Sequence, residues 1–232
     1  MTKAAVIIGA SGGIGSAFAD ALEEEGDYAR VWRFSRSVGG DGQLDVTDEA
    51  SIAAAAARVE QSYPLAIIFV ATGLLHGDEL RPEKALKDLD AAQLARNYAV
   101  NAIGPALIAK HFLPLLPREE RGVFAALSAR VGSITDNRVG GWHGYRASKA
   151  ALNMIIKNLA IELARTHKRA ICVGLHPGTV DTGLSKPFQG NVRPGSLFTP
   201  VRAAVQLLDV IEGLRPPDSG KCFAWDGEEV KP

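Results

Sequence analysis

Residues 4–15 read AAVIIGASGGIG, an apolar run that leads straight into a glycine-rich loop. The run from Ala4 to Ala10 is typical of a strand that is buried on both faces. A segment of helical period follows from Gly13 to Glu25 and stops at Gly26. The loop glycines let the backbone turn tightly and approach a pyrophosphate, which the N-terminus of the helix would attract. The stretch therefore predicts a strand, loop and helix that bind a dinucleotide, and the alternative is a plain strand-to-helix turn.

The rest of the chain repeats this alternation of apolar runs and helical segments. Further strands are predicted at Ala29–Ser35, Gly42–Val46, Ala66–Thr72, Val123–Ser128, Ile171–His176 and Cys222–Trp225, and helices at Ala50–Ser62, Asp90–Leu116, Gly144–His167 and Pro200–Glu212. Near-continuous apolar strands that alternate with helices indicate right-handed βαβ units and a parallel sheet covered on both faces. We therefore predict one domain over residues 1–232, a doubly wound α/β Rossmann fold with about seven parallel strands and helices on both faces.

The composition excludes several classes of protein. Hydrophobic residues make up 47% and charged residues 22%, which suits a globular core and excludes disorder. Lys plus Arg number 26 and Asp plus Glu number 26, so no basic field indicates nucleic acid binding. No apolar run reaches the ~18 residues of a membrane span. Cys172 and Cys222 form no zinc or disulfide pattern, and with no signal-peptide pattern they favour a reducing, cytoplasmic compartment.

The choice of cofactor depends on the end of the second predicted strand. An acid that binds the ribose of NAD is expected about 20 residues beyond the glycine loop. Ser35 stands there and Arg36 follows. An acid would repel a 2′-phosphate, whereas a hydroxyl and a guanidinium would bind it, so the sequence favours NADP over NAD. The alternative for Arg36 is a solvated charge. Asp45, with Val46, would hold the adenine, or Asp45 is a turn residue.

Two residues on a predicted helix suggest the chemistry. Tyr145 and Lys149 are four residues apart, so they share one helix face. A nearby ammonium favours phenolate and lowers the pKa of a tyrosine, which can then act as a general acid or base near neutral pH. The spacing alone is common in amphipathic helices. It gains weight here because a strand that ends at Ser128 precedes it and a phosphate loop opens the chain.

With these motifs in place, the chain resembles the short-chain dehydrogenase/reductase family over nearly its whole length. The matching positions are Gly9, Gly13 and Gly15 of a Gly-x-x-x-Gly-x-Gly motif, Ala71-Thr72-Gly73, Asn101, the pair Tyr145 and Lys149, and the turn Pro177-Gly178-Thr179-Val180-Asp181-Thr182. Within the family, Gly132-Ser133-Ile134 and Gly140-Gly141-Trp142 resemble the C-factor-like carbonyl reductase branch.

The resemblance implies an NADP(H)-dependent oxidoreductase that transfers hydride between nicotinamide and a carbonyl or secondary alcohol. Tyr145 would exchange a proton with the substrate oxygen, Lys149 would bind the nicotinamide ribose, and Asn101 would hold a water in the proton path. The predicted cofactor contacts are Gly9, Ser11, Gly13, Ile14, Gly15, Ser35, Arg36, Asp45, Val46, Ala71, Gly73, Tyr145, Lys149, Pro177, Gly178, Val180 and Thr182. No metal is expected, because no histidine pair has metal-ligand spacing.

Two departures from the family pattern stand out. Val70, followed by Ala71, replaces the family's asparagine pair, and Ala129 stands where the family has a serine three residues before a glycine. Ser128 or Ser133 could supply the missing hydroxyl; Ser128 is favoured because it ends a strand, and both could instead be loop or capping serines. Ala129 keeps a second interpretation open, a nucleotide-binding signalling or regulatory protein with little turnover.

Two further features concern the surroundings of the site. The segment from Leu184 to Leu197 has no clear period and would form a lid after the sixth strand. Trp142, Leu74 and Phe188 would form an apolar substrate wall or be ordinary packing residues. The two long helices carry apolar residues beyond one stripe, which predicts a homodimer, with a homotetramer also open. These residues are Ala95, Ala99, Ile103, Leu107, Phe112, Leu152, Ile155, Ile156, Leu159 and Leu163.

Overall fold

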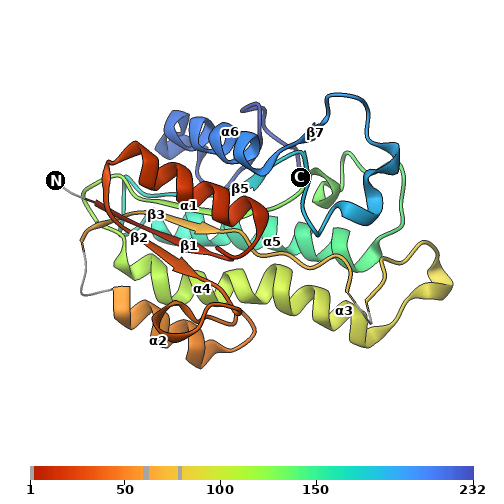
Figure 1. Ribbon diagram of the computed structural model, residues 1–232, viewed down its shortest axis with the longest axis horizontal. Coiled ribbons are helices and arrows are strands. Elements are labelled where there is room, and N and C mark those ends of the chain that lie inside the picture. The colour runs from red at the N-terminus through yellow and green to blue at the C-terminus, as the bar shows by residue number, and fades with distance from the viewer. Residues whose placement is uncertain (1–2, 60–62, 78–79) are drawn as a thin grey trace.

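A six-stranded parallel sheet forms the centre of the computed structural model, which describes residues 3–59, 63–77 and 80–232 (Figure 1). Its spatial order is β2 (Tyr28–Phe34), β1 (Lys3–Ile8), β3 (Leu65–Val70), β4 (Val123–Leu127), β5 (Ile171–His176) and β8 (Cys222–Ala224). The chain runs from β1 to β2 on one side and returns to β3 on the other. Open α/β sheets bind their ligands at such a switch point.

Helices cover both faces of this sheet, as predicted. On one face lie α1 (Gly13–Glu25) and α6 (Pro200–Gly213), and on the other lie α2 (Glu49–Val59), α3 (Ala91–Tyr98), α4 (Gly104–Phe112) and α5 (His143–Leu163) (Figure 1). The strands are apolar along their length because alternate side chains enter the two cores: Val6 and Ile8 face α2 and α4, and Ala5 and Ile7 face α1.

The predicted bounds hold best where the local signals are strongest. α1 ends at Gly26, whose φ of 74° is the left-handed conformation that a glycine C-cap adopts. β5 has its predicted bounds. The predicted helix Ala50–Ser62 is α2, which extends from Glu49 to Val59, and residues 60–62 lie outside the described ranges.

One predicted strand is wrong. The segment Gly42–Val46 contributes a single bridge, from Gln43 to Ser35, because a 3₁₀ turn over Gly40–Gly42 precedes it and a turn at Asp45 follows it. The main sheet therefore has six strands where about seven were expected. Two parallel strands of two residues each, β6 (Thr179–Val180) and β7 (Leu197–Phe198), pair outside the main sheet. Strands this short leave no detectable periodicity in the sequence.

The predicted helix Asp90–Leu116 is interrupted rather than uniform. Between α3 and α4 the chain forms a π-helix, η3 (Ala99–Ile103), in which the N–H of Gly104 donates to the carbonyl of Ala99. A 3₁₀ turn over Leu113–Leu115 ends the run. A Cβ at position 104 would lie 2.9 Å from the Val46 carbonyl oxygen, so glycine allows this close approach. Single π turns in helices often mark functional positions, and this one contains Asn101.

No helix in the described ranges combines the length and the apolar character needed to cross a bilayer.

Candidate active site

The glycine loop packs closely against the carboxyl ends of the strands. Gly9 has a φ of 88°, and the Gly12 N–H donates to its carbonyl at 3.0 Å. A Cβ at Gly15 would stand 2.3 Å from that same oxygen, so no larger residue fits there. α1 begins after Gly12, which has no side chain to cap it. Ser11 is exposed and Ile14 half-buried beside the first turn of α1, whose N–H groups are therefore available to an anion.

The loops after β1, β3 and β5 converge on this helix start. The Ala71 N–H donates to the Ile8 carbonyl at 2.7 Å, and Thr72 contacts the position where a Gly9 Cβ would be. A Cβ at Gly13 would lie 2.9 Å from the Thr182 methyl group. The predicted phosphate-binding and carboxamide-binding segments are therefore neighbours.

The end of β2 holds the residues predicted to select the cofactor. Ser35 is buried, and its hydroxyl accepts from the Val38 N–H at 3.2 Å, while Arg36 is exposed. Arg33 is held by ion pairs to Asp20 at 2.6 Å and to Glu23 at 2.8 Å on α1. Arg36 rather than Arg33 is therefore the guanidinium available to a bound phosphate.

Asp45 is a turn residue in this structure. Its Oδ1 accepts from the backbone N–H of Thr47 at 2.9 Å and from the Thr47 hydroxyl at 2.7 Å. These hydrogen bonds are the main reason why the pKa of the Asp45 carboxyl is lowered, and Arg36 contributes a smaller electrostatic effect. The Val46 carbonyl is packed against Gly104 at the π-helix.

Tyr145 and Lys149, the predicted catalytic pair, are buried, and burial shifts the pKa values of both side chains. Burial raises the pKa of the Tyr145 hydroxyl to about 12 and lowers the pKa of the Lys149 ammonium to about 8. Lys149 Nζ donates to the Leu127 carbonyl at 2.7 Å and lies 5.8 Å from the centre of the Tyr145 ring. The expected lowering of the tyrosine pKa is therefore absent in this arrangement, because the ammonium faces a carbonyl and desolvation dominates.

Asn101 ties three elements together from inside the π-helix. Its Oδ1 accepts from the Leu74 N–H at 2.8 Å, and its Nδ2 donates to the Leu74 carbonyl at 2.8 Å and to Ser148 Oγ at 3.1 Å. Ser148 Oγ in turn donates to the Tyr145 carbonyl at 2.8 Å. A Cβ at Gly73 would lie 3.9 Å from both Asn101 Oδ1 and Lys149 Nζ. The structure thus brings the predicted residues after β3, in the π-helix and on α5 into one cluster.

Both candidate serines are buried and already hydrogen-bonded. Ser128 Oγ donates to Asn153 Oδ1 at 2.6 Å, whereas Ser133 Oγ accepts from the Asp136 N–H at 3.0 Å. Ala129 stands between the end of β4 and the 3₁₀ turn that starts at Arg130. The role assigned to Ser128 remains a prediction.

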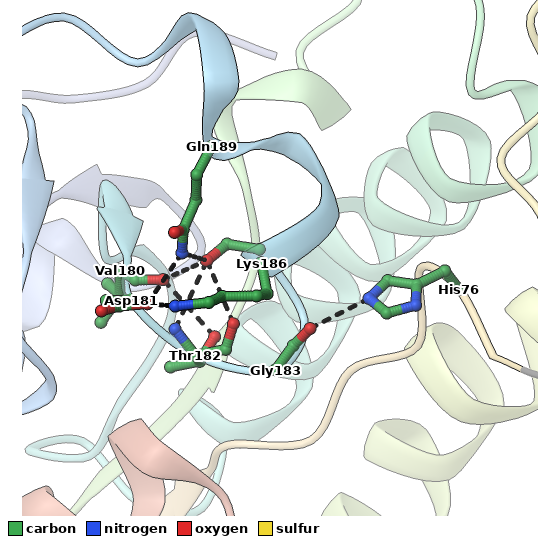
Figure 2. A network of polar contacts seen from close by, with 8 residues as sticks. His76, Val180, Asp181, Thr182, Gly183, Lys186 and Gln189 are labelled. Atoms are coloured by element: carbon green, nitrogen blue, oxygen red, sulfur yellow. Dashed lines mark hydrogen bonds and ion pairs between the residues drawn. The ribbon is translucent and has the colours of Figure 1, made fainter.

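A polar network connects the loop after β5 to the start of the predicted lid, Leu184–Leu197 (Figure 2). His76 Nε2 is 3.0 Å from the Gly183 carbonyl oxygen, just before the predicted lid. Within the loop, Gln189 Nε2 donates to Asp181 Oδ1 at 2.9 Å, and Lys186 Nζ lies 3.5 Å from the same carboxylate. At its start, the Pro177-Gly178 turn is tight, since Gly178 has a φ of 76° and a Cβ there would be 2.7 Å from the Phe198 ring.

Aromatic rings connect the predicted lid to Tyr145. Trp142 meets Tyr145 edge-on at 6.3 Å between ring centroids, Phe188 meets Trp142 at 4.9 Å, and His76 meets Phe188 at 5.6 Å. Trp142 and Phe188, two of the three residues proposed as an apolar wall, are therefore in contact above Tyr145. Trp142 has a φ of 49°, a positive value that no other non-glycine residue among those described adopts.

Two polar residues at the site were not singled out from the sequence. Thr72 Oγ1 is buried and has no hydrogen-bond partner among the described residues. Glu83, in the loop between β3 and α3, is buried against the start of α5. Its carboxylate accepts from the Gly144 N–H at 3.2 Å. Thr72 lies within a recognised motif, but no sequence signal distinguishes Glu83 from an ordinary loop acid. Within the described ranges, no group of three or more His, Cys, Asp or Glu side chains could hold a metal ion.

Comparisons with known proteins identify the family of the chain. A family model described as enoyl-(acyl carrier protein) reductase matches residues 9–196. C-signal of Myxococcus xanthus is 38% identical over 146 residues, which cover 63% of this chain and 82% of that protein. The 1-hydroxy-2-glutathionyl-2-methyl-3-butene dehydrogenase of Rhodococcus sp. (strain AD45) is 35% identical over 185 residues, which cover 79% of this chain and 76% of that protein.

Solved structures show the same fold. NADPH-bound carbonyl reductase from chicken fatty liver matches with a TM-score of 0.78 at 25% identity, covering 99% of both chains. The carbonyl reductase Sniffer of D. melanogaster matches with a TM-score of 0.81 at 22% identity, covering all of both chains. With the match to the family model and to the two curated relatives, these findings show that the chain belongs to the short-chain dehydrogenase/reductase family, in its carbonyl reductase branch.

Proposed function

We propose that this protein is an NADP(H)-dependent oxidoreductase that transfers hydride between nicotinamide and a carbonyl or secondary alcohol. The observation that carries the proposal is the cluster of Tyr145, Lys149 and Asn101, buried together beside the carboxyl ends of β3 and β4. Two similar proteins support it, since one is a dehydrogenase and the other is an NADPH-bound carbonyl reductase.

The glycine loop and the start of α1 fit the phosphate groups of a dinucleotide. The approach of Gly9 to Gly15 leaves a cradle that a Cβ would fill, and the uncapped start of α1 lies at its edge. Thr72 Oγ1 is a buried hydroxyl with no partner in the described part of the chain. Ser35 and Arg36 would face the 2′-phosphate, and Asp45 with Val46 would flank the adenine. Near the other end, Lys149 would hold the nicotinamide ribose, and Pro177, Gly178, Val180 and Thr182 would hold the carboxamide.

The proposed mechanism divides the work between cofactor and protein. The bound nicotinamide supplies or accepts the hydride. Tyr145 Oη gives a proton to the carbonyl oxygen of the substrate, or takes it from the alcohol. Its pKa must fall from about 12 for this to occur near neutral pH, and Lys149 would lower it once its ammonium turned from the Leu127 carbonyl toward the Tyr145 hydroxyl. Asn101 would orient a water for proton exchange, and the rings of Trp142 and Phe188 would exclude bulk water.

Ser128 is the proposed substrate-binding hydroxyl. To bind a carbonyl oxygen, it would give up its 2.6 Å hydrogen bond to Asn153. Ala129 favours the second candidate function, a nucleotide-binding signalling or regulatory protein with little turnover, because the family's usual hydroxyl is missing at that position. The similarity to C-signal is compatible with this second function.

Oxidation of NADPH in the presence of aldehydes, ketones and quinones separates the two functions. We expect turnover by the wild type. Tyr145→Phe should bind NADPH normally but turn over roughly 10²–10⁴-fold more slowly, the range for loss of a general acid. Tight NADPH binding without turnover on any member of the panel would favour the regulatory function. An active Tyr145→Phe variant would refute the role of Tyr145.

A further inference from the structure

Glu83 is a buried acid that the mechanism above does not use. It is 3% exposed and lies in the loop between β3 and α3, about sixty positions before α5 in the chain. One carboxylate oxygen, Oε2, accepts from the Gly144 N–H at 3.2 Å. Its backbone carbonyl accepts from the Trp142 N–H at 2.5 Å. Glu83 therefore contacts α5 at the residues immediately before Tyr145.

These contacts replace a cap that α5 does not provide for itself. α5 starts at His143, and its N-cap residue, Trp142, has a left-handed backbone and makes no side-chain capping hydrogen bond. The first N–H groups of a helix need acceptors, and a carboxylate there also interacts favourably with the helix dipole. Glu83 supplies both from another part of the chain, so the loop after β3 fixes where α5 begins.

The burial of the Glu83 carboxylate is energetically unfavourable and sterically restricted, which supports a specific role for this residue. Burial of a carboxylate is unfavourable unless hydrogen bonds satisfy it, and Oε1 has no partner among the described residues. A Cβ at position 144 would stand 2.9 Å from Glu83 Oε1 and 2.9 Å from Asn97 Nδ2. The absence of a side chain at Gly144, directly before Tyr145, therefore lets the Glu83 carboxylate and the Asn97 amide both approach the backbone of α5 closely.

A chain of hydrogen bonds connects Asn97, which packs beside Glu83 at Gly144, to the proposed catalytic cluster. Asn97 Oδ1 accepts from Asn101 Nδ2 at 3.4 Å, and the same Nδ2 donates to Ser148 Oγ. Ser148 Oγ donates to the carbonyl of Tyr145. The first turn of α5 is thus fixed from two sides, by Glu83 before Tyr145 and by Asn101 through Ser148 after it.

We propose that Glu83 is a positioning residue for Tyr145, which sets the start of α5 and thereby the place of the tyrosine hydroxyl. The proposal rests on the proposed function of Tyr145 as the proton donor. Misplacement of a catalytic group by about 1 Å can lower a rate by as much as ~10²-fold. Because Tyr145 acts on the reacting oxygen, misplacement should lower kcat and leave the KM of the substrate and the binding of NADPH nearly unchanged.

Three substitutions at this position test the idea. Glu83→Ala removes the acceptor, and Glu83→Asp keeps the charge but shortens its reach to the Gly144 N–H. We expect both to lower kcat by roughly 10- to 100-fold with little change in KM. Glu83→Gln keeps an oxygen acceptor of the same length and should restore most of kcat. If Glu83→Ala does not fold, Glu83→Asp and Glu83→Gln still decide the question.

Asp88→Asn is the matched control. Asp88 is an exposed acid in the same loop, and its carboxylate accepts from the N–H groups of Lys84 and Ala85 without touching α5. We expect its kcat within about twofold of the wild type. A wild-type kcat in Glu83→Asp, or an equal loss in Asp88→Asn, would overturn the proposal, as would a loss confined to KM or NADPH binding.

A second measurement does not depend on turnover. Hydrogen exchange at the amides of residues 142–148 should speed up in Glu83→Asp and stay unchanged in Glu83→Gln and Asp88→Asn. If the wild type turns over no substrate, the proposed function fails, while the exchange data still decide whether Glu83 fixes the start of α5. Unchanged exchange in Glu83→Asp would contradict the role of Glu83 itself.

Discussion

Lys149 illustrates at the scale of a residue how function opposes stability. Its ammonium is buried and has the Leu127 carbonyl as its acceptor, and burial lowers its pKa to about 8. Below that pH the folded protein must keep a desolvated charge. Between about pH 8 and the unfolded value near 10.5, the unfolded chain binds more protons than the folded one. The free energy of unfolding should therefore rise with pH across this window.

Replacement of the charge should reveal this effect. We expect Lys149→Met to abolish turnover and to raise the free energy of unfolding at pH 7 by about 1–3 kcal/mol. The rise in stability of the wild type between pH 8 and 10 should disappear in the variant. Urea unfolding at several pH values measures both quantities, with Lys157→Met, an exposed lysine on the same helix, as the control. A variant less stable at pH 7 than the wild type would contradict the argument.

Arg36 gives the second prediction at this scale. Arg36→Ala should weaken NADPH binding by about 1–3 kcal/mol, the range for a charged hydrogen-bonding partner, and leave NADH nearly unaffected. Arg33→Ala is the matched control, because Arg33 is engaged by Asp20 and Glu23 and should affect both cofactors alike. Titration with each cofactor by fluorescence or calorimetry decides. Equal losses for both cofactors in Arg36→Ala would show that another group selects between them.

At this scale, the sequence predicts which side chains share a helix face, but it does not predict pKa values that depend on burial and on contacts distant in the chain. Tyr145 and Lys149 could be paired because four residues on a helix share a face. The pKa of Tyr145 could not be predicted, because it depends on how deeply the ring is buried and on where the Lys149 ammonium points. Glu83 was missed for the same reason, since its importance depends on contacts with a helix far away in the chain.

At the scale of elements, local signals explain which boundaries were predicted. α1 could be bounded from the glycines before it and Gly26 after it, because caps are encoded within a few residues. The strand expected at Gly42–Val46 failed because three glycines between 39 and 42 favour a turn over an extended run. The π-helix around Asn101 could not be foreseen, because no local sequence signal distinguishes its residues from those of an ordinary α-helix.

The predicted lid, Leu184–Leu197, provides the prediction at this scale. His76 Nε2 lies 3.0 Å from the carbonyl oxygen of Gly183, the residue just before the predicted lid (Figure 2). The His76 ring also contacts Phe188 within the predicted lid. His76→Ala should speed hydrogen exchange across residues 183–189 and raise the KM of the substrate roughly 2- to 10-fold, since a neutral hydrogen bond contributes about 0.5–1.5 kcal/mol. Lower kcat with an unchanged KM would instead place His76 in the chemistry.

Lys186→Ala is the control for this experiment. The Lys186–Asp181 pair is exposed and 3.5 Å long, and pairs of this kind contribute little to stability. We expect both hydrogen exchange and KM to stay within about twofold of the wild type. An effect as large as that of His76→Ala would mean that the network inside the segment, rather than its contact with the loop after β3, holds the lid.

At the scale of the whole molecule, the doubly wound architecture could be predicted, because apolar strands that alternate with helices form right-handed βαβ units around a parallel sheet. The surface was harder to predict. Of the apolar residues that suggested an interface, Phe112, Leu152, Ile156 and Leu163 are buried in the core of the chain itself. The exposed apolar side chains on α5 include Met154 and Ile161, which the sequence analysis did not single out.

Three large apolar side chains are exposed on the π-helix and α5. Ile103 in the π-helix is 52% exposed, and on α5 Met154 is 62% and Ile161 is 52% exposed. Met154 and Ile161 are seven residues apart and so share a face of α5. A chain with zero formal net charge has no strong repulsion to keep such faces apart. The family resemblance implies that these two helices pair with those of a second copy, and a two-fold arrangement is the commonest closed solution.

We therefore expect a homodimer at micromolar concentration, with a mass in sedimentation of twice the 24.6 kDa of the chain. Ile161→Lys places a charge in the predicted interface, where it cannot be hydrated, and should shift the protein toward the monomer. Val201→Lys is the matched control, because Val201 is 67% exposed on α6, on the opposite face of the sheet, and should leave the mass unchanged. α5 carries Tyr145, so dissociation should also lower turnover if the partner braces this helix. A wild-type chain that sediments as a stable, active monomer would reject the dimer, and loss of the dimer in Val201→Lys alone would move the interface to the other face.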